Sequence, residues 1–474
     1  MGTNDNSELL SRRSLIKGLA LSATTLTLMA HQASDTPVQS ATLNADRAST
    51  AERCWQDAQK KSKKEKSPEA TERMRWWREA RLGLFIHWNP SSLVAGEISW
   101  CKDFSNGTSE TNRRPDTQGG HEPQGWWEDI GTRVPASVYD NLQKSFYPAM
   151  FDAHRYVALA KEAGMKYIIP VCKHHDGFCM WDTHYTDFNI MHTPFKRDII
   201  GELAAAAHAA SLKFGVYYSQ RDWHHPDYVT NLPRYNAYMR HQIHELLTQY
   251  GDIAVLYFDA QNYPAATWET ETLFKMVAEL HPNIIINDRC GVPADFTSPE
   301  QHIGSFDTER NWETTATFTR HWSWHGFDTP VIPFEAFLRM LVHCAGGDGN
   351  LLMDIGPLPT GDISPAETDR LVKMGAWLGK YGESIYGTSG GPFLPGEWGA
   401  STYRDRVIYL HVLDWSKMPA RLSELTGKID SHVVLTGGFA NVTQEADGTA
   451  VTMAAHQQDK TNTVIKLTMD SPVV

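Results

Sequence analysis

The segment KYIIPVCKHHDGF (residues 166–178) joins a run of apolar residues directly to a cluster of polar ones. The β-forming residues at its start predict a buried strand. Lys173, two adjacent histidines and Asp176 follow, where an ordinary turn would need only Asp-Gly. Two interpretations are open. Either Asp176-Gly177 is a turn flanked by histidines by chance, or the strand carries polar groups into a pocket.

Apolar runs of the same kind recur along the chain and alternate with helical patterns of Ala, Leu and charged residues. This alternation predicts parallel strands joined by helices, as in βαβ units. Six such units favour an α/β fold of the (β/α)8-like (TIM) barrel type, with some irregular units, over a short open sheet. The predicted strands are residues 83–88, 166–171, 213–219, 253–259, 283–288 and 350–356, and the clearest helices are residues 152–164, 198–211, 234–251 and 365–382.

We assign the barrel to residues 76–390. After it, short alternating strands separated by Gly, Asn and Asp predict a small C-terminal antiparallel β-sandwich over residues 391–474. Residues 34–75 form a polar lead-in. In residues 1–33, the paired arginines of SRRSLIKG precede an apolar stretch too short to span a bilayer, which resembles a bacterial twin-arginine export signal. We therefore expect an exported bacterial protein, periplasmic or secreted, with no membrane association after signal removal.

Composition limits the possible partners. The chain has 474 residues, 41% of them hydrophobic, which is enough for a large core. Its 44 basic and 56 acidic residues give a net charge of −12, which argues against nucleic acid or an anionic membrane as a partner. The six cysteines form no C-x-x-C pair, so neither a zinc ribbon nor a redox motif is indicated, and free buried thiols are expected.

Polar residues end five of the predicted strands. In (β/α)8 barrels the functional groups lie at the carboxyl ends of the strands, so these side chains are expected to meet in one polar cavity. They are His87 and Trp88; Lys173, His174, His175 and Asp176; Tyr217, Tyr218 and Ser219, followed by Asp222 and Trp223; Asp259; and Asn287, Asp288 and Arg289.

A metal, a serine nucleophile and a phosphate loop are each poorly supported by the sequence. The histidines that could bind a metal are His87, His174, His175, His224 and His225. Adjacent strand residues point to opposite faces, so one histidine of each pair is expected to face a given ion. No G-x-S-x-G elbow occurs, and GGDGN (346–350) lacks the Lys and the helix of a phosphate loop. We expect no metal or cofactor.

Carboxylates remain as candidate catalysts. Asp259 ends the apolar strand IAVLYFD, where an ionised group needs a partner, and Arg289 could be that partner. A simple Asp–Arg ion pair between strands is the other interpretation. A second carboxylate could come from the segment after NDRC, and two carboxylates among aromatic residues suit hydrolysis of a glycosidic bond. The candidates there are Asp295, Glu300, Asp307, Glu309 and Glu313.

Several motifs resemble the α-L-fucosidases of glycoside hydrolase family 29, over about residues 76–390. They are GLFIHW, KHHDGF with its flanking residues, KFGVYYSQRDW, LYFDA, INDRCG, SPEQ and GNLLMDIGPLPTGDI. The resemblance implies a retaining exo-glycosidase that removes terminal α-L-fucose from glycans or polysaccharides through a covalent glycosyl-enzyme. It also implies a barrel followed by a β-sandwich, a fucosylated oligosaccharide or polysaccharide substrate, and no metal.

The resemblance also implies roles for individual residues. Asp259 would be the nucleophile and Glu300 the acid/base, with Glu313 as the alternative acid/base. The residues implied to bind substrate are His87, His174, His175, Tyr217 near the nucleophile, Tyr257 in place of a common Trp, and Arg289 beside the acid/base loop.

Two other functions stay open at this point. One is a retaining glycosidase for a related sugar such as α-L-galactose. The other is a non-catalytic carbohydrate-binding protein, which the presence of two suitable carboxylates disfavours.

Overall fold

The computed structural model describes residues 68–104, 133–260 and 263–473. The predicted export signal (residues 1–33) and most of the polar lead-in (residues 34–75) lie outside these ranges. Helix α2 (Pro68–Ala80) begins within the predicted lead-in, and its Met74 and Trp77 are buried. Among the described residues, no helix combines the length and the apolar character needed to cross a bilayer.

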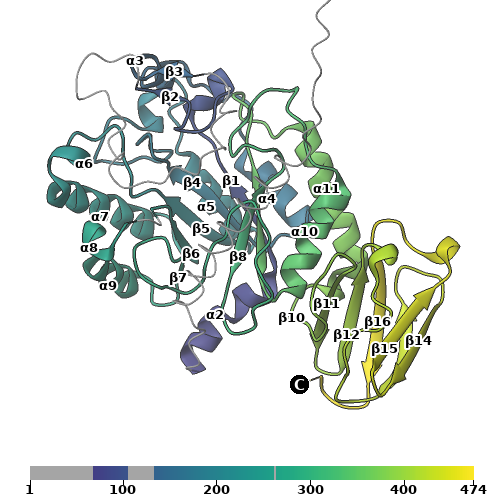
Figure 1. Cartoon of the computed structure of the whole chain (residues 1–474). Coiled ribbons are helices and arrows are strands. Elements are labelled where there is room, and N and C mark those ends of the chain that lie inside the picture. The colour runs from purple at the N-terminus through teal and green to yellow at the C-terminus, as the bar shows by residue number, and fades with distance from the viewer. Residues whose placement is uncertain (1–67, 105–132, 261–262, 474) are drawn as a thin grey trace, which may run out of the picture. The chain divides into compact units, whose positions relative to one another are not determined.

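Within the described residues, seven parallel strands form one sheet in the order β7-β6-β5-β4-β1-β9-β8 (Figure 1). The six predicted strands are all present. The seventh, β8, was not predicted, because its sequence ETTAT contains no large apolar residue. The strands are β1 (Leu82–Ile86), β4 (Tyr167–Lys173), β5 (Lys213–Tyr218), β6 (Val255–Phe258), β7 (Ile285–Ile286), β8 (Glu313–Thr317) and β9 (Asn350–Ile355).

An irregular segment, residues 295–301, lies between β7 and β8 and continues the sheet. It makes isolated parallel bridges on both sides, from Phe296 to Asn287 after β7, and from Thr297 and Glu300 to Trp312 and Thr315. This segment therefore serves as an irregular eighth strand. The predicted (β/α)8-like fold with irregular units is confirmed.

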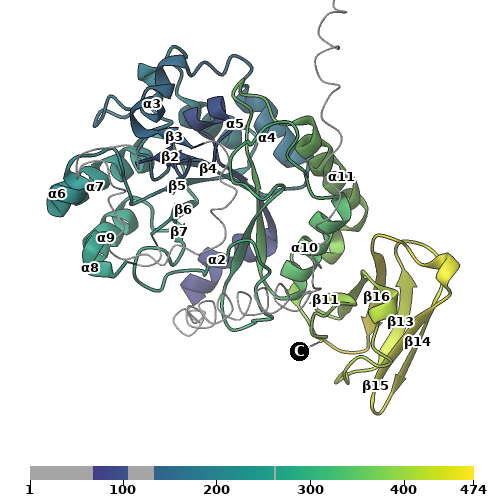
Figure 2. The same cartoon turned by 45° about the horizontal axis from the view of Figure 1, so that its top comes forward.

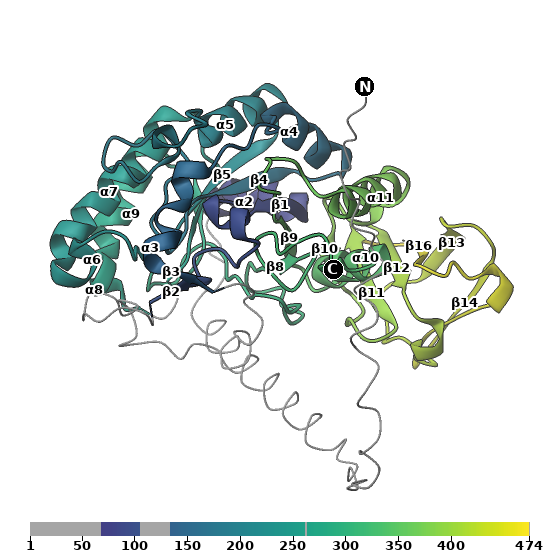
Figure 3. The same cartoon turned by 90° about the horizontal axis from the view of Figure 1, so that it is seen from above.

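Helices cover the outer face of the strands, as the view from above shows (Figure 3). Several begin with a polar side chain that accepts backbone N–H groups, such as Asp152 before α4, Asp198 before α5 and Ser364 before α11. The covering helices are α4 (Ala153–Glu162), α5 (Ile199–Ala209), α7 (Leu232–Gln249), α9 (Thr270–Leu280), α10 (Phe334–Gly346) and α11 (Pro365–Tyr381). Shorter elements are α3 (Ala136–Tyr139), α6 (Asp227–Thr230), α8 (Ala265–Trp268), β2 (Lys102–Asp103) and β3 (Val134–Pro135).

Alternate residues of each strand pack in two different cores. Phe85, Tyr257 and Leu352 belong to the core inside the barrel, whereas their neighbours belong to the core under the helices. Because side chains alternate along a strand, the residues two positions further on also face inward. These are His87, Asp259 and Asp354, and they lie beyond the inner core at the carboxyl ends of β1, β6 and β9.

The C-terminal residues form two antiparallel sheets around a separate apolar core, which confirms the predicted β-sandwich (Figure 2). One sheet has the order β10-β11-β12-β16-β13 and the other pairs β14 with β15. Helix α10 packs against β11, and a Cβ at Gly346 would meet Cβ of Ala400 at 2.4 Å. The strands are β10 (Ser389–Gly390), β11 (Gly399–Arg404), β12 (Val407–Val412), β13 (Ile429–Val434), β14 (Ala440–Glu445), β15 (Gly448–Met453) and β16 (Thr463–Met469).

The cysteines of the described residues are free and buried, as expected from the sequence. They are Cys101, Cys172, Cys179, Cys290 and Cys344. Cys54 lies outside the described ranges.

Glu313, the alternative acid/base, lies at the wrong end of the barrel for that role. It is the first residue of β8 and is paired with Asn350, the first residue of β9. Its fully buried carboxyl group accepts hydrogen bonds from Nε1 of Trp77 at 3.2 Å and from the hydroxyl of Tyr167, at the start of β4. Glu313 therefore does not lie with Glu300 at the carboxyl ends of the strands, and this position does not support it as the alternative acid/base. The sequence did not reveal β8, and so could not show which end of a strand Glu313 occupies.

Burial raises the pKa of Glu313 to about 8, from an ordinary value of 4.5. The folded protein thus keeps a proton that the unfolded chain releases, and stability falls as pH rises through this interval. Glu313→Gln carries no such proton. We therefore expect the free energy of unfolding of Glu313→Gln, relative to wild type, to rise by up to about 1.4 kcal/mol per pH unit between pH 4.5 and 8. Chemical denaturation at several pH values measures this difference, and a pH-independent difference would contradict the assignment.

Candidate active site

Asp259 directly follows β6 and is held by three groups. The hydroxyl of Tyr217 donates to Oδ2 at 2.5 Å, and Nη1 of Arg289 donates to Oδ1 at 3.0 Å. The backbone N–H of Asp259 donates to Oε1 of Gln220 at 2.9 Å. Burial by itself would raise the pKa of Asp259, but the charge of Arg289 and the hydrogen bond from Tyr217 outweigh it, so the pKa lies below its ordinary value. Asp259 is therefore an ionised carboxylate at the mouth of the barrel.

Glu300 shares the guanidinium nitrogen that holds Asp259. Nη1 of Arg289 donates to Oε1 of Glu300 at 2.5 Å and to Oδ1 of Asp259 at 3.0 Å. The two oxygens therefore lie no further apart than these two distances together, about 5.5 Å. Carboxyl groups roughly 5–5.5 Å apart are typical of retaining glycosidases, whereas inverting enzymes need roughly 6.5–9.5 Å to admit a water molecule.

The other carboxylates proposed from this segment have structural contacts. Asp295 accepts hydrogen bonds from Nη1 of Arg73 and from the backbone N–H of Ile286, both at 2.9 Å. Asp307 accepts the backbone N–H groups of Glu309 and Arg310, which form a turn. Of the five candidates, Glu300 is the one that the structure brings to Arg289 and Asp259.

Three histidines surround Asp259, and each is fixed through Nδ1. Burial lowers the pKa of His87 well below its ordinary value and that of His174 to about 4, so both rings are neutral near pH 7. Neutral imidazoles suit hydrogen bonding to sugar hydroxyls. The Nδ1 contacts are His87 with Oδ1 of Asp354 at 2.7 Å, His174 with Oγ of Ser99 at 2.6 Å, and His175 with Oγ of Ser219 at 2.6 Å.

His174 and His175 face the same site, which contradicts the expectation that one histidine of the pair would point away. One ligand atom from each, together with a carboxylate oxygen of Asp259, lies within 4.8 Å of the others. The expectation was wrong because β4 ends at Lys173, so the pair lies in the turn that follows. Gly177 completes this turn with a φ of 85°, a conformation that favours glycine.

Lys173 points to the other face of β4, where its Nζ donates to Asp222 at 3.0 Å. Tyr218 likewise faces outward and donates to Oε1 of Gln242 at 2.7 Å. His224 and His225 donate their backbone N–H groups to Asp222. Lys173, Tyr218 and Asp222 were expected in the pocket, and His224 and His225 were considered as metal ligands, but these contacts stabilise the structure around the pocket.

Several residues of the site were not singled out from the sequence. Asp354 was visible as a lone carboxylate in the apolar strand NLLMDIG, but it was not connected with His87. Trp322, from the segment after β8, lies over His87 with ring centroids 4.8 Å apart. Ser99 and Gln220 gave no sequence signal, because their roles depend on contacts with residues distant in the sequence.

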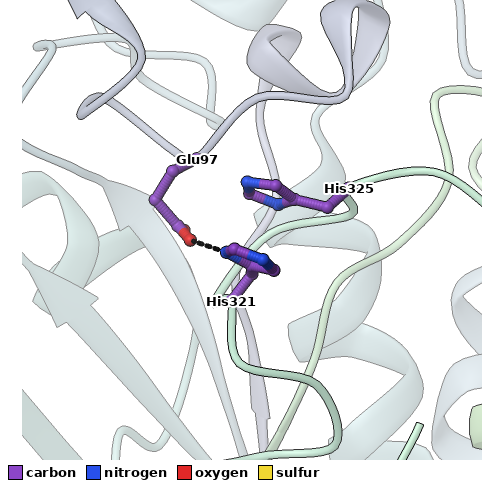
Figure 4. A group of neighbouring side chains, drawn as sticks. All are labelled: Glu97, His321 and His325. Atoms are coloured by element: carbon purple, nitrogen blue, oxygen red, sulfur yellow. Dashed lines mark hydrogen bonds and ion pairs between the residues drawn. The ribbon is translucent and has the colours of Figure 1, made fainter. Parts of the chain in front are cut away.

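Among the residues that the structure describes, two groups of side chains have the donor atoms of a metal site. One is His174, His175 and Asp259, and the other, drawn in Figure 4, is Glu97, His321 and His325. In the first group, Arg289 already supplies the positive charge beside Asp259 that a metal ion would otherwise supply. In the second, the rings of His321 and His325 stack at 3.5 Å and 10°, whereas an ion bound to two imidazoles lies near the plane of each. Glu97 instead accepts the backbone N–H groups of Trp322 and Ser323 at 3.2 Å and contacts Nδ1 of His321. This second group therefore anchors a loop.

Comparison with known proteins agrees with this geometry. A family profile described as alpha-L-fucosidase matches residues 49–383, which is more than half of the chain. The chain belongs to the alpha-L-fucosidase family. It is 25% identical to plasma alpha-L-fucosidase of Homo sapiens over 381 residues, covering 72% of this chain and 76% of the human protein.

Solved structures of family members share the fold. Alpha-L-fucosidase isoenzyme 1 from Paenibacillus thiaminolyticus is 32% identical, with a TM-score of 0.73, covering 84% of this chain and 99% of that one. A GH29 alpha-L-fucosidase from Bacteroides thetaiotaomicron, trapped as a covalent intermediate with 2-fluoro-fucosyl fluoride, is 26% identical with a TM-score of 0.71, covering 86% and 98%. This chain is thus similar to alpha-L-fucosidases along nearly all of its barrel and sandwich.

The contact between Tyr217 and Asp259 can be tested against a neighbouring tyrosine. Tyr217→Phe removes a hydrogen bond to a charged group. We expect it to lower kcat/KM for an aryl α-L-fucoside by roughly 10–100-fold. Because this bond lowers the pKa of Asp259, its loss should move the acidic limb of the pH–rate profile to higher pH. Tyr218→Phe, which faces outward, is the matched control and should leave that limb unchanged.

Proposed function

We propose that this fucosidase-family chain hydrolyses terminal α-L-fucosides with retention, by double displacement through a covalent glycosyl-enzyme. The observation that supports the mechanism most directly is the pair of carboxylates on Arg289, with Asp259 and Glu300 within about 5.5 Å. Membership of the family supports the choice of sugar, and the trapped intermediate of the Bacteroides thetaiotaomicron relative supports the covalent step.

In the first step, the ionised Asp259 attacks C1 of the fucose while the bond from C1 to the leaving oxygen breaks. Glu300 gives its proton to that oxygen, so the aglycone leaves as a neutral alcohol and Glu300 becomes ionised. The side chain of Glu300 is 39% exposed and that of Asp259 is 20% exposed, so Glu300 is the better placed to contact a departing group.

In the second step, a water molecule attacks C1 of the glycosyl-enzyme and Glu300 takes its proton. The ester bond to Asp259 breaks, and free fucose leaves with its original anomeric configuration. The neutral rings of His87 and His174, each held through Nδ1, would bind the sugar hydroxyls through Nε2 during both steps. Tyr257 would contribute its ring to the floor of this site.

Azide rescue assigns the two carboxylates separately. Asp259→Gly should lower kcat for an aryl α-L-fucoside by about 10³-fold or more, and azide should restore turnover with β-fucosyl azide as the product. Glu300→Ala should lower kcat/KM for a substrate with a poor leaving group by about 10²–10⁴-fold, and azide should then give α-fucosyl azide. Proton NMR of the anomeric signal distinguishes the two products.

Glu313→Gln is the matched control for Glu300, because both are glutamates of the same region. It should retain activity within about twofold, since its carboxyl group lies at the far end of the barrel. Intact activity in Asp259→Gly, or azide rescue in a Glu313 variant, would overturn these assignments.

We also propose that the chain is exported through the twin-arginine route. The support is the order of features in residues 1–33, with Arg12 and Arg13 ahead of an apolar stretch. Replacing both arginines with lysine should leave active enzyme in the cytoplasm of a bacterial host, whereas the wild type should appear in the periplasm or medium. Fractionation followed by an α-L-fucosidase assay measures this, and equal export of both forms would contradict the proposal.

A further inference from the structure

The loop between β8 and α10 (residues 318–333) carries three aromatic side chains in the sequence HWSWHGF. The third, Phe327, is 75% exposed, more than any other large hydrophobic side chain of the described residues. It meets Trp324 edge to face, with ring centroids 5.3 Å apart. At the adjacent Gly326, φ is 101°, and an added Cβ would meet no atom within 4 Å, so the tip of the loop is open. Phe327 is thus exposed and Trp324 half-buried, and together they offer aromatic surface that suits a ligand with an apolar face.

The same loop is part of the sugar site. Its Trp322 lies over the ring of His87. Glu97 fixes the backbone beside Trp322 by accepting two N–H groups and contacting His321, as Figure 4 shows for the side chains. Trp324 and Phe327 therefore belong to a loop whose position relative to His87 is fixed.

The base of the loop adjoins the acid/base segment. Nε2 of Gln301, the residue after Glu300, donates to Oγ1 of Thr317 at 3.1 Å, where β8 ends and the loop begins. The aglycone must leave past Glu300, because that residue protonates the leaving oxygen. The loop therefore begins on the side of the barrel from which the leaving group departs.

We propose that Trp324 and Phe327 form an aglycone platform, which binds the sugar ring to which the terminal fucose is attached. Pyranose rings present C–H faces that stack on aromatic side chains, and such contact removes the apolar surface of Phe327 from water. This inference rests on the proposed function. The occupant is a carbohydrate because the platform is carried by the same loop as Trp322, whose ring lies against His87 in the site proposed for fucose.

The test compares two substrates that differ only in the leaving group. α-L-Fucosyl fluoride has no sugar aglycone, whereas 2′-fucosyllactose has one. Phe327→Ala should lower kcat/KM for 2′-fucosyllactose by about tenfold and leave that for the fluoride within about twofold. Phe327→Tyr keeps a flat ring and should restore the activity. Phe439→Ala, a control at a 63% exposed phenylalanine of the β-sandwich, should change neither substrate.

The outcomes separate this inference from the proposed function. A wild type that hydrolyses neither substrate contradicts the proposed function itself. A wild type that hydrolyses both, with Phe327→Ala unchanged on 2′-fucosyllactose or equally impaired on both substrates, overturns the platform alone. Size-exclusion chromatography of the same variants gives a further check, because dissociation of a dimer in Phe327→Ala would assign Phe327 to a contact between copies of the chain.

Discussion

The barrel depends on closing a gap that regular pairing leaves open between β7 and β8. β7 has two residues, too few for a full ladder, and the segment of residues 295–301 bridges both neighbours in its place. Asn287 completes the adjoining edge with its side chain, which accepts the N–H of Phe258 and donates to its carbonyl oxygen. Because this closing segment also carries Glu300, the acid/base candidate is positioned by backbone bonds on both sides.

Arg289 offsets the charge repulsion that arises when the closing segment brings Glu300 close to Asp259. Two carboxylates so close together repel each other, and a buried ionised group is costly without a partner. The guanidinium lies between them, and its other nitrogens are held by Ser298, through Nε to Oγ at 2.8 Å and through Nη2 to the carbonyl oxygen at 2.5 Å. Since Ser298 belongs to the closing segment, the position of the positive charge is fixed by the same part of the chain as Glu300.

The sequence predicted those parts of the site that follow from strand periodicity. His87 and Asp259 end apolar strands, so their inward direction could be inferred from the alternation of side chains. Asp354 obeys the same rule and was available to the same argument. Trp322 and Ser99 could not be found in this way, because loops bring them to the site from distant parts of the chain. The choice between Glu300 and Glu313 needed β8, whose polar sequence ETTAT does not show a strand pattern.

The hydroxyl partners of His174 and His175 have a consequence for substrate recognition. An ionised carboxylate can only accept a hydrogen bond from a ring nitrogen, whereas a serine hydroxyl can either donate or accept one. The hydroxyls of Ser99 and Ser219 can therefore keep their hydrogen bonds to Nδ1 of His174 and His175 in either tautomer of the ring. In His174, Nε2 can then act as acceptor for one alcohol and as donor for another, whereas in His175 Nε2 already lies 3.5 Å from Oδ2 of Asp259. The ring of His174 can therefore adapt to the orientation of a hydroxyl group without any change in the charge of the site.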